Sequence, residues 1–130
     1  MYSVEEVAHD VFNRLLIFDQ EAGTDYSVQF PETKIKEEHP KQGSFNPDFF
    51  IKAGNDIIVV EIKMDSDVSD ENKAKLRYSK EHFARVNELQ KEQRYYFKFL
   101  SPGSYDLFFK ALREKTYKNF RSELEAKLEE

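Results

Sequence analysis

Three ionisable residues lie inside or beside the most apolar stretch of the sequence. Asp48 follows Pro47 at the start of one apolar run, and Glu61 and Lys63 lie near the end of the next run, which spans residues 56–64. A charged side chain is rarely left in a buried strand without a partner, because desolvating a lone charge costs several kcal/mol. Two carboxylates and an ammonium in this arrangement can serve as a cation site or as a structural ion-pair cluster.

The first of these alternatives has a specific chemistry. Two carboxylates a few ångströms apart repel one another, and a bound Mg²⁺ relieves that repulsion because it takes oxygen ligands while keeping several waters. Mg²⁺ lowers the pKa of a bound water and stabilises charge that develops on a phosphate oxygen. The ammonium of Lys63 can orient or deprotonate the attacking water, or neutralise the phosphate. The alternative is an ion-pair cluster of Asp48, Glu61 and Lys63 at the end of a strand.

The residues around this group predict two strands in a hairpin. The apolar runs over 48–53 and 56–64 are typical of strands, and Gly54-Asn55 between them favours the tight turn that joins antiparallel neighbours. Both faces of the second strand are apolar, which is typical of a central strand covered on both sides. The sequence therefore predicts that this strand is buried in the middle of a sheet.

Strand geometry then predicts where the three ionisable side chains point. Successive side chains alternate between the two faces of a strand, so Glu61 and Lys63 share one face at the end of the buried strand. If the hairpin pairs across its turn, Asp48 lies at the outer end of the partner strand, close to Glu61. Two carboxylates and an ammonium are therefore expected to converge where the sheet meets solvent.

The remaining elements are predicted to surround this hairpin. Periodicity predicts short strands over 25–30 and 94–100, and helices over 3–19, over 72–92 and from residue 104 until the chain fades into a charged tail. The order predicts an α/β fold, with a small mixed four-stranded sheet flanked by helices and followed by a C-terminal helix. Apolar residues expected to face inward from the second and third helices are Leu76, Phe83, Val86, Leu89, Leu107, Phe108, Leu112 and Tyr117.

Length and composition limit the class of protein. At 130 residues the chain is expected to be one domain, and twelve Phe and seven Tyr give ample material for a core. No apolar run approaches the roughly 20 residues of a membrane span, and the acidic start lacks the basic residues of a secretory signal, so a cytoplasmic protein without a membrane partner is expected. The absence of Cys excludes thiolate zinc sites and cysteine nucleophiles.

Charge is distributed unevenly along the chain. Residues 1–71 carry 6 Lys and Arg against 16 Asp and Glu, whereas residues 72–98 carry 8 against 3. On the predicted second helix this basic segment favours a surface that binds nucleic-acid phosphates, and a solvated helix face is the alternative. The residues expected to bind DNA are Lys73, Lys75, Tyr78, His82 and Arg85.

The pattern Pro47-Asp48 followed by Glu61-Ile62-Lys63 at the end of an apolar strand resembles the PD-(D/E)xK nuclease superfamily. The minimal core of that superfamily is a helix, three strands, a helix and a strand, which is the αβββαβ order of the restriction-endonuclease-like fold and would cover most of this chain. The resemblance implies that Asp48 and Glu61 ligate Mg²⁺, or Mn²⁺ as its substitute. It further implies that the backbone carbonyl of Ile62 adds a ligand and that Lys63 is catalytic.

A narrower resemblance concerns the segments "EEVAHDVFNRLL", "NPDFFI" and "VVEIKMDSD", which are similar to nuclease domains of the helicase subunits of type III and type I restriction systems. In many of these a Glu of the first helix faces the metal site, which makes Glu6 a candidate ligand. The alternative is that Glu6 is only the capping-box partner of Ser3. Many relatives also carry Gln-x-x-x-Tyr on the following helix, whereas this chain has Ala74 at the Gln position before Tyr78.

Together these expectations favour a Mg²⁺-dependent endonuclease that hydrolyses DNA phosphodiester bonds, as the cutting module of a restriction protein. The implied partners are DNA, an ATP-dependent helicase or translocase domain or subunit, and a second copy of the chain for double-strand cutting. One alternative is a non-catalytic nucleic-acid-binding module that retains the nuclease fold, and another is a protein-interaction domain. The intact set of Asp48, Glu61 and Lys63 favours the enzyme, since a decayed nuclease usually loses one member.

Overall fold

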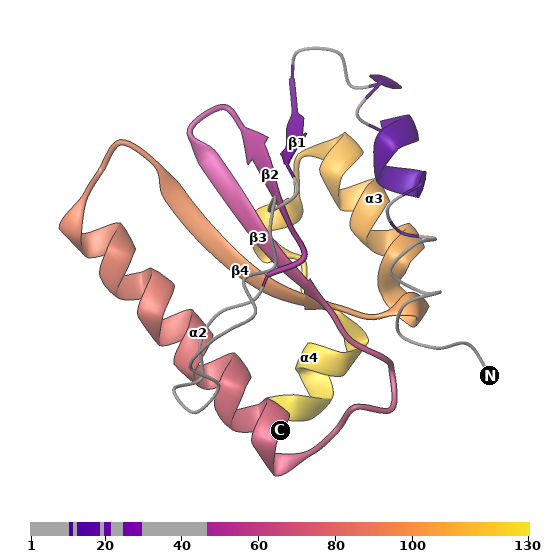
Figure 1. The fold of residues 1–130 in the computed structure, drawn as a ribbon, viewed down its shortest axis with the longest axis vertical. Coiled ribbons are helices and arrows are strands. Elements are labelled where there is room, and N and C mark those ends of the chain that lie inside the picture. Colours follow the sequence, from indigo (N-terminus) through magenta and orange to yellow (C-terminus); the bar gives the residue numbers. More distant parts are fainter. Residues whose placement is uncertain (1–10, 12, 19, 22–24, 30–46) are drawn as a thin grey trace.

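The computed structural model describes residues 11, 13–18, 20–21, 25–29 and 47–130. Its centre is a four-stranded mixed sheet whose strands follow one another in the order of the sequence (Figure 1). The first three strands are antiparallel neighbours, and the third and fourth are parallel. The strands are β1 (Ser27–Gln29), β2 (Phe49–Ala53), β3 (Asp56–Ile62) and β4 (Arg94–Leu100). The predicted α/β class, with a small mixed sheet flanked by helices, is confirmed.

The predicted hairpin is present as β2 and β3. Gly54 begins its turn at φ +63°, in the left-handed region that glycine enters without the steric cost of a Cβ. The register pairs Phe49 with Val60 at one end and Ala53 with Asp56 at the other. Because β3 lies between β2 and β4, both of its edges are paired. Its two faces are covered by side chains of two hydrophobic clusters, and the residues from Ile58 to Ile62 are buried.

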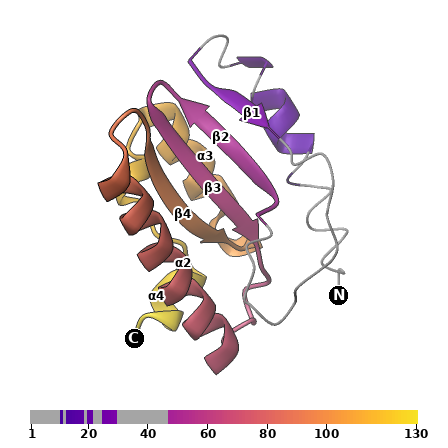
Figure 2. The ribbon, with the colours of Figure 1, turned by 60° about the vertical axis from the view of Figure 1, so that its left-hand side comes forward.

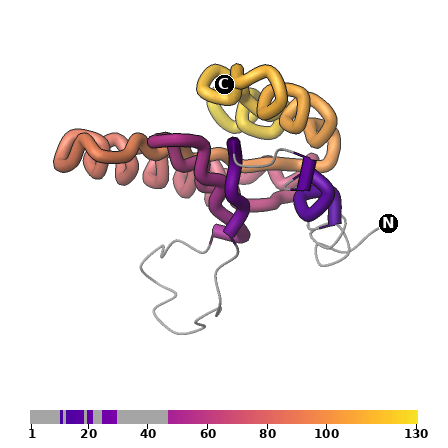
Figure 3. The backbone as a smooth tube through the Cα atoms, turned by 90° about the horizontal axis from the view of Figure 1, so that it is seen from above, coloured from indigo at the N-terminus to yellow at the C-terminus, as the bar shows by residue number. Residues whose placement is uncertain are grey.

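Helices cover the sheet through two hydrophobic clusters. The first cluster joins the helical residues 11 and 13–18 and helix α3 (Tyr105–Glu114) to side chains of β2 and β3. The second joins helix α2 (Asp70–Leu89) and helix α4 (Glu123–Leu128) to side chains of β3 and β4. Helix α2 runs alongside β4 (Figure 2). Helix α3 lies to one side of the strands (Figure 3), whereas α4 packs with α2 and β4 in the second cluster.

Helix α2 begins and ends slightly earlier than the sequence predicted. The side chain of Ser69 accepts a hydrogen bond from the amide of Asn72 and caps the helix, so it starts at Asp70. The helix ends at Leu89, which is 85% exposed, so the expectation that Leu89 faces the core is wrong. The inward stripe of the helix carries buried Leu76 and Ser79, and half-buried Phe83 packs against the second cluster. Val86, which was also expected to face inward, is half-buried.

The C-terminal region differs from the single fading helix that the sequence predicted. Helix α3 follows the short 3-10 turn at Pro102–Ser104 and ends because Lys115 takes the left-handed conformation at φ +60°. A 3-10 turn, Tyr117–Asn119, then leads to α4. The residues that were expected to be a charged tail form this helix. Leu107 is 61% exposed, so its predicted inward position is also wrong, whereas Phe108, Leu112 and Tyr117 are buried as expected.

Glu125 explains why the tail folds back onto the sheet. It is fully buried, and its two carboxylate oxygens accept hydrogen bonds from the amide of Ser122, at 3.0 Å, and from the amide of Phe99 on β4, at 3.1 Å. The first bond is half of a capping box that starts α4, because the Ser122 hydroxyl accepts from the amide of Glu125 in return. Glu125 therefore closes part of the outer edge of β4.

Replacing Glu125 by Gln is expected to lower the free energy of unfolding by about 1–3 kcal/mol, because the amide NH₂ would face one of two buried N–H donors. Burial raises the pKa of Glu125, against the lowering effects of its hydrogen bonds and of Lys80 and Lys98. A raised folded pKa stabilises the parent at low pH, and this contribution is lost as the pH rises from 4.5 through the folded pKa. Urea denaturation should therefore give a larger gap between parent and variant at about pH 5 than at about pH 8.

The exposed Glu123 on the same helix provides the matched control, Glu123→Gln, which should leave the free energy of unfolding nearly unchanged. A gap between the parent and Glu125→Gln that widened from acid to alkaline pH would contradict the role assigned to this carboxylate.

Candidate metal and nucleic-acid site

Glu61 lies at the end of β3 and is almost completely buried, with 8% of its side chain exposed. Its Oε2 accepts a hydrogen bond from the Lys75 ammonium at 2.7 Å and lies 3.5 Å from the Lys63 Nζ. Its Oε1 is also buried, and no described residue hydrogen-bonds to it. A buried carboxylate with one unsatisfied oxygen is costly, so this atom needs a partner.

Asp48 lies beside Glu61 on the neighbouring chain segment, directly before β2. Its amide donates to the carbonyl of Val60 at 2.8 Å, and its Oδ2 accepts from the amide of Ile62 at 2.7 Å. Val60 and Ile62 are the two residues that flank Glu61 along β3. Asp48 is therefore hydrogen-bonded to the residues on both sides of Glu61 and lies opposite Glu61 across the hairpin. The two carboxylate residues are neighbours at the end of the sheet.

Ile62 contributes backbone atoms at the same place. Its side chain is buried in the first hydrophobic cluster, while its amide points toward β2 and donates to Asp48. The amide and carbonyl of one strand residue point toward the same neighbouring strand. The carbonyl of Ile62 therefore points to the side of β3 on which Asp48 lies. The resemblance implies an accessory ligand at this carbonyl.

Lys63 follows the end of β3 and keeps its ammonium close to the carboxylate of Glu61. Its amide donates to the carbonyl of Leu100 at 2.9 Å, which extends the pairing of β3 with β4 by one residue. Its Nζ lies 5.4 Å from the centroid of the Phe99 ring and 3.5 Å from Glu61 Oε2. The backbone thus fixes Lys63, and the ring of Phe99 restricts where the ammonium can lie.

The side chain of Lys75 points to a different place from the one that its sequence position predicts. It was expected to bind DNA phosphates from the surface of α2, but its side chain turns to Glu61 and only 26% of it is exposed. On the helix, Lys75 precedes the buried Leu76 and therefore stands at the border of the inward stripe. The site thus contains two lysines, Lys63 from the strand and Lys75 from the helix.

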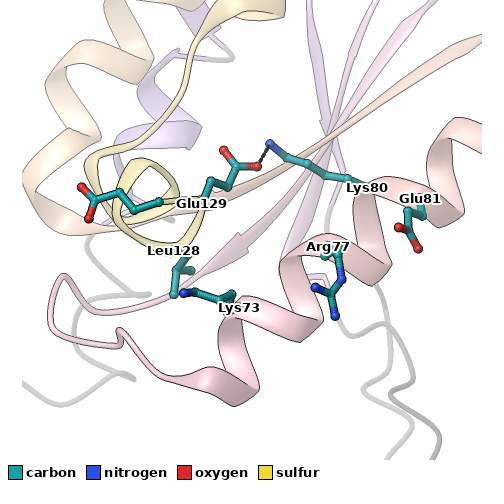
Figure 4. A pocket seen from close by; sticks show the side chains of 7 residues that line it. Lys73, Arg77, Lys80, Glu81, Leu128 and Glu129 are labelled. Atoms are coloured by element: carbon teal, nitrogen blue, oxygen red, sulfur yellow. Dashed lines mark hydrogen bonds and ion pairs between the residues drawn. The ribbon is translucent and has the colours of Figure 1, made fainter.

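The other residues expected to bind DNA lie on two different flanks of α2. Tyr78 is 47% exposed, its ring stacks on His82 with centroids 6.5 Å apart, and Arg85 is exposed one turn farther on. Their spacing places them on the flank of Lys75. Lys73 instead lines a cavity of about 360 Å³ between α2 and α4 with Arg77, Lys80 and Leu128 (Figure 4). Within that cavity Lys80 pairs with Glu129 at 2.8 Å.

The described residues offer few protein ligands for a metal ion. Among the described residues there is no group of three or more His, Cys, Asp or Glu side chains that could hold a metal. Mg²⁺ commonly uses one or two carboxylates and fills its remaining positions with waters and phosphate oxygens. Asp48 and Glu61 are the two carboxylates that could hold such an ion at this end of the sheet, together with the Ile62 carbonyl. Glu6 lies outside the described residues.

Neither a membrane-spanning helix among the described residues nor a related protein offers a guide to the function of this chain. Within the part of the chain that the structure describes, no helix combines the length and the apolar character that crossing a membrane requires. Comparison of the sequence with protein-family models and with curated proteins, and of the fold with solved structures, finds no significant match.

Proposed function

We propose that this chain is a Mg²⁺-dependent endonuclease that hydrolyses DNA phosphodiester bonds and has a restriction-endonuclease-like core. The observation that supports the proposal most strongly is the convergence of Asp48, Glu61 and Lys63 at one end of the central strand β3. Further support comes from the order of the elements, which is three strands, a helix and a strand, with helical residues 11 and 13–18 before them.

The unsatisfied oxygen of Glu61 supports a cation site rather than a cluster that is complete by itself. Oε2 has an ammonium partner, but Oε1 is buried without a hydrogen bond from any described residue. Leaving such an oxygen unsatisfied costs roughly 1–3 kcal/mol, and more for a charged group. Binding of a divalent cation would satisfy Oε1 and offset the repulsion between the carboxylates of Glu61 and Asp48.

Each residue has a role in this proposal. Asp48, Glu61 and the carbonyl of Ile62 would hold Mg²⁺, for which Mn²⁺ can substitute. When bound, the ion supplies an activated water and stabilises charge on the phosphate. The ammonium of Lys63 orients the attacking water or neutralises the phosphate as negative charge accumulates.

DNA would approach along the flank of α2 that faces this site. Arg85 supplies a charge for phosphate contacts, and the stacked rings of Tyr78 and His82 lie between Arg85 and the carboxylates along the helix. Phosphate contacts of this kind position the substrate without reading its sequence, and they weaken as the salt concentration rises. The resemblance further supports a role as the cutting module of a larger restriction protein driven by a helicase or translocase, with a homodimer for double-strand cutting.

A cleavage assay tests the proposal. Purified protein is incubated with supercoiled plasmid and with linear single-stranded DNA, in Mg²⁺, in Mn²⁺ and in excess chelator. We expect cleavage in both metals and none in the chelator, because the chain's own groups cannot replace the metal's charge. DNA binding without cleavage in either metal would favour the non-catalytic module, and the absence of both would favour a structural ion-pair cluster.

A further inference from the structure

We propose that Lys75 is the counter-ion of Glu61 and thereby sets the Mg²⁺ affinity of the candidate site, an inference that rests on the proposed function. The two residues come from different elements, Lys75 from α2 and Glu61 from β3. Their atoms Nζ and Oε2 are 2.7 Å apart, which is the length of a charge-assisted hydrogen bond. Lys63 lies farther from the same oxygen, at 3.5 Å.

Burial makes Lys75 important to the metal-free protein. Only 8% of the Glu61 side chain and 26% of the Lys75 side chain are exposed, so solvent screens their attraction poorly. Removing one member of a buried pair leaves an uncompensated charge and is strongly destabilising. The Lys63 ammonium is too far from Oε2 to donate a normal hydrogen bond to it, so Lys75 is the main partner of Glu61 among the described residues.

The contact between Lys75 and Glu61 also opposes the binding of Mg²⁺ to Glu61. The ammonium occupies Oε2, so an incoming Mg²⁺ meets a carboxylate with one oxygen already bound and with its charge partly neutralised. Mg²⁺ on Oε1 would also lie within a few ångströms of the positive charge of Lys75, and like charges at that separation repel strongly in a poorly solvated site. Removing the charge of Lys75 should therefore tighten Mg²⁺ binding while it destabilises the metal-free fold.

The variant Lys75→Gln tests both consequences, because it keeps a hydrogen-bond donor but removes the charge. Its melting temperature in excess chelator should fall by about 5 °C or more. Its dissociation constant for Mg²⁺, measured by calorimetry without DNA, should fall about tenfold, which corresponds to about 1.4 kcal/mol. The matched control is Lys73→Gln, because Lys73 is exposed on the other flank of α2 and makes no ion pair with any described residue. That control should change neither quantity.

The outcomes separate this inference from the proposed function. If the parent binds Mg²⁺ and Lys75→Gln matches Lys73→Gln in affinity and melting temperature, the counter-ion role is wrong while the nuclease proposal stands. If the parent binds no Mg²⁺, the metal site is wrong and the inference fails with it. Should Lys75→Gln not fold, the double variant Glu61→Gln/Lys75→Gln is decisive: recovery of the fold supports the counter-ion role, and continued unfolding overturns it.

Discussion

Replacing Glu61 by Gln is expected to lower the rate of DNA cleavage by at least about a hundredfold while DNA binding is retained. Gln keeps the size of the side chain, and its amide oxygen can still accept the hydrogen bond from Lys75 that Glu61 Oε2 accepts at 2.7 Å. The negative charge that would hold Mg²⁺ is removed. Single-turnover cleavage at saturating DNA measures the chemical step, and fluorescence anisotropy with labelled DNA measures binding.

Thermal unfolding supplies an independent readout for the same variant. A ligand that binds only the folded protein raises its melting temperature, so Mg²⁺ should stabilise the parent and have little effect on Glu61→Gln. The exposed Glu88 on α2 offers a matched control, and Glu88→Gln should cleave DNA and respond to Mg²⁺ as the parent does. Cleavage by Glu61→Gln at the rate of the parent would mean that the carboxylate cluster is structural.

The second large effect is expected for Lys63→Ala, which should also reduce cleavage on the order of a hundredfold. This variant removes the ammonium that lies 3.5 Å from Glu61 Oε2 but leaves both carboxylates in place. Mg²⁺ should therefore bind to Lys63→Ala and raise its melting temperature, unlike that of Glu61→Gln. If Lys63→Ala loses cleavage but still binds Mg²⁺, then Lys63 acts on the water or the phosphate and is not needed to bind the ion.

Lys52 on β2 provides the control for Lys63, because its side chain is exposed on the adjacent strand. Lys52→Ala should leave the cleavage rate within about twofold of the parent, as is usual for a surface change away from the reacting groups. Equal rates for Lys63→Ala and Lys52→Ala would show that Lys63 takes no part in the chemistry, and the ion-pair alternative would then explain its position.

The central part of the fold was predictable because local and tertiary preferences agree there. The apolar runs on both sides of Gly54-Asn55 favour strands, and the turn requires a residue that tolerates positive φ, which Gly54 supplies. The alternating sequence of β4 matches the observed strand, Arg94–Leu100. These elements also predicted that Asp48 and Glu61 are neighbours, because pairing across a short turn leaves little freedom of register.

The C-terminal region was predicted less well because its helices are short and highly charged. A six-residue helix such as α4 is not stable by itself and depends on tertiary packing. The sequence does contain a usable signal, since Ser122 followed three residues later by Glu125 matches a capping box. What the sequence could not show is that Glu125 would be buried and would also bind the amide of Phe99.

The position of Lys75 could not be predicted for a related reason. Helical periodicity placed Lys75 on the same flank of α2 as Tyr78 and Arg85, which is correct as a description of the helix. The contact with Glu61 depends on how α2 lies against β3, and one helical pattern is compatible with several such arrangements. The basic character of the segment therefore indicated a surface role, whereas the structure pairs one of its lysines with a buried carboxylate.

The most direct test of the proposed metal site is a crystal of the protein soaked in Mn²⁺, with anomalous diffraction used to locate the ion. We expect one anomalous peak between the carboxylates of Asp48 and Glu61, about 2.0–2.3 Å from the nearest oxygen of each, with the Ile62 carbonyl near the peak. The peak should be absent from crystals of Glu61→Gln soaked in the same way. Crystals of the parent with no Mn²⁺ between Asp48 and Glu61, or with the ion held equally well by Glu61→Gln, would contradict the proposed metal site.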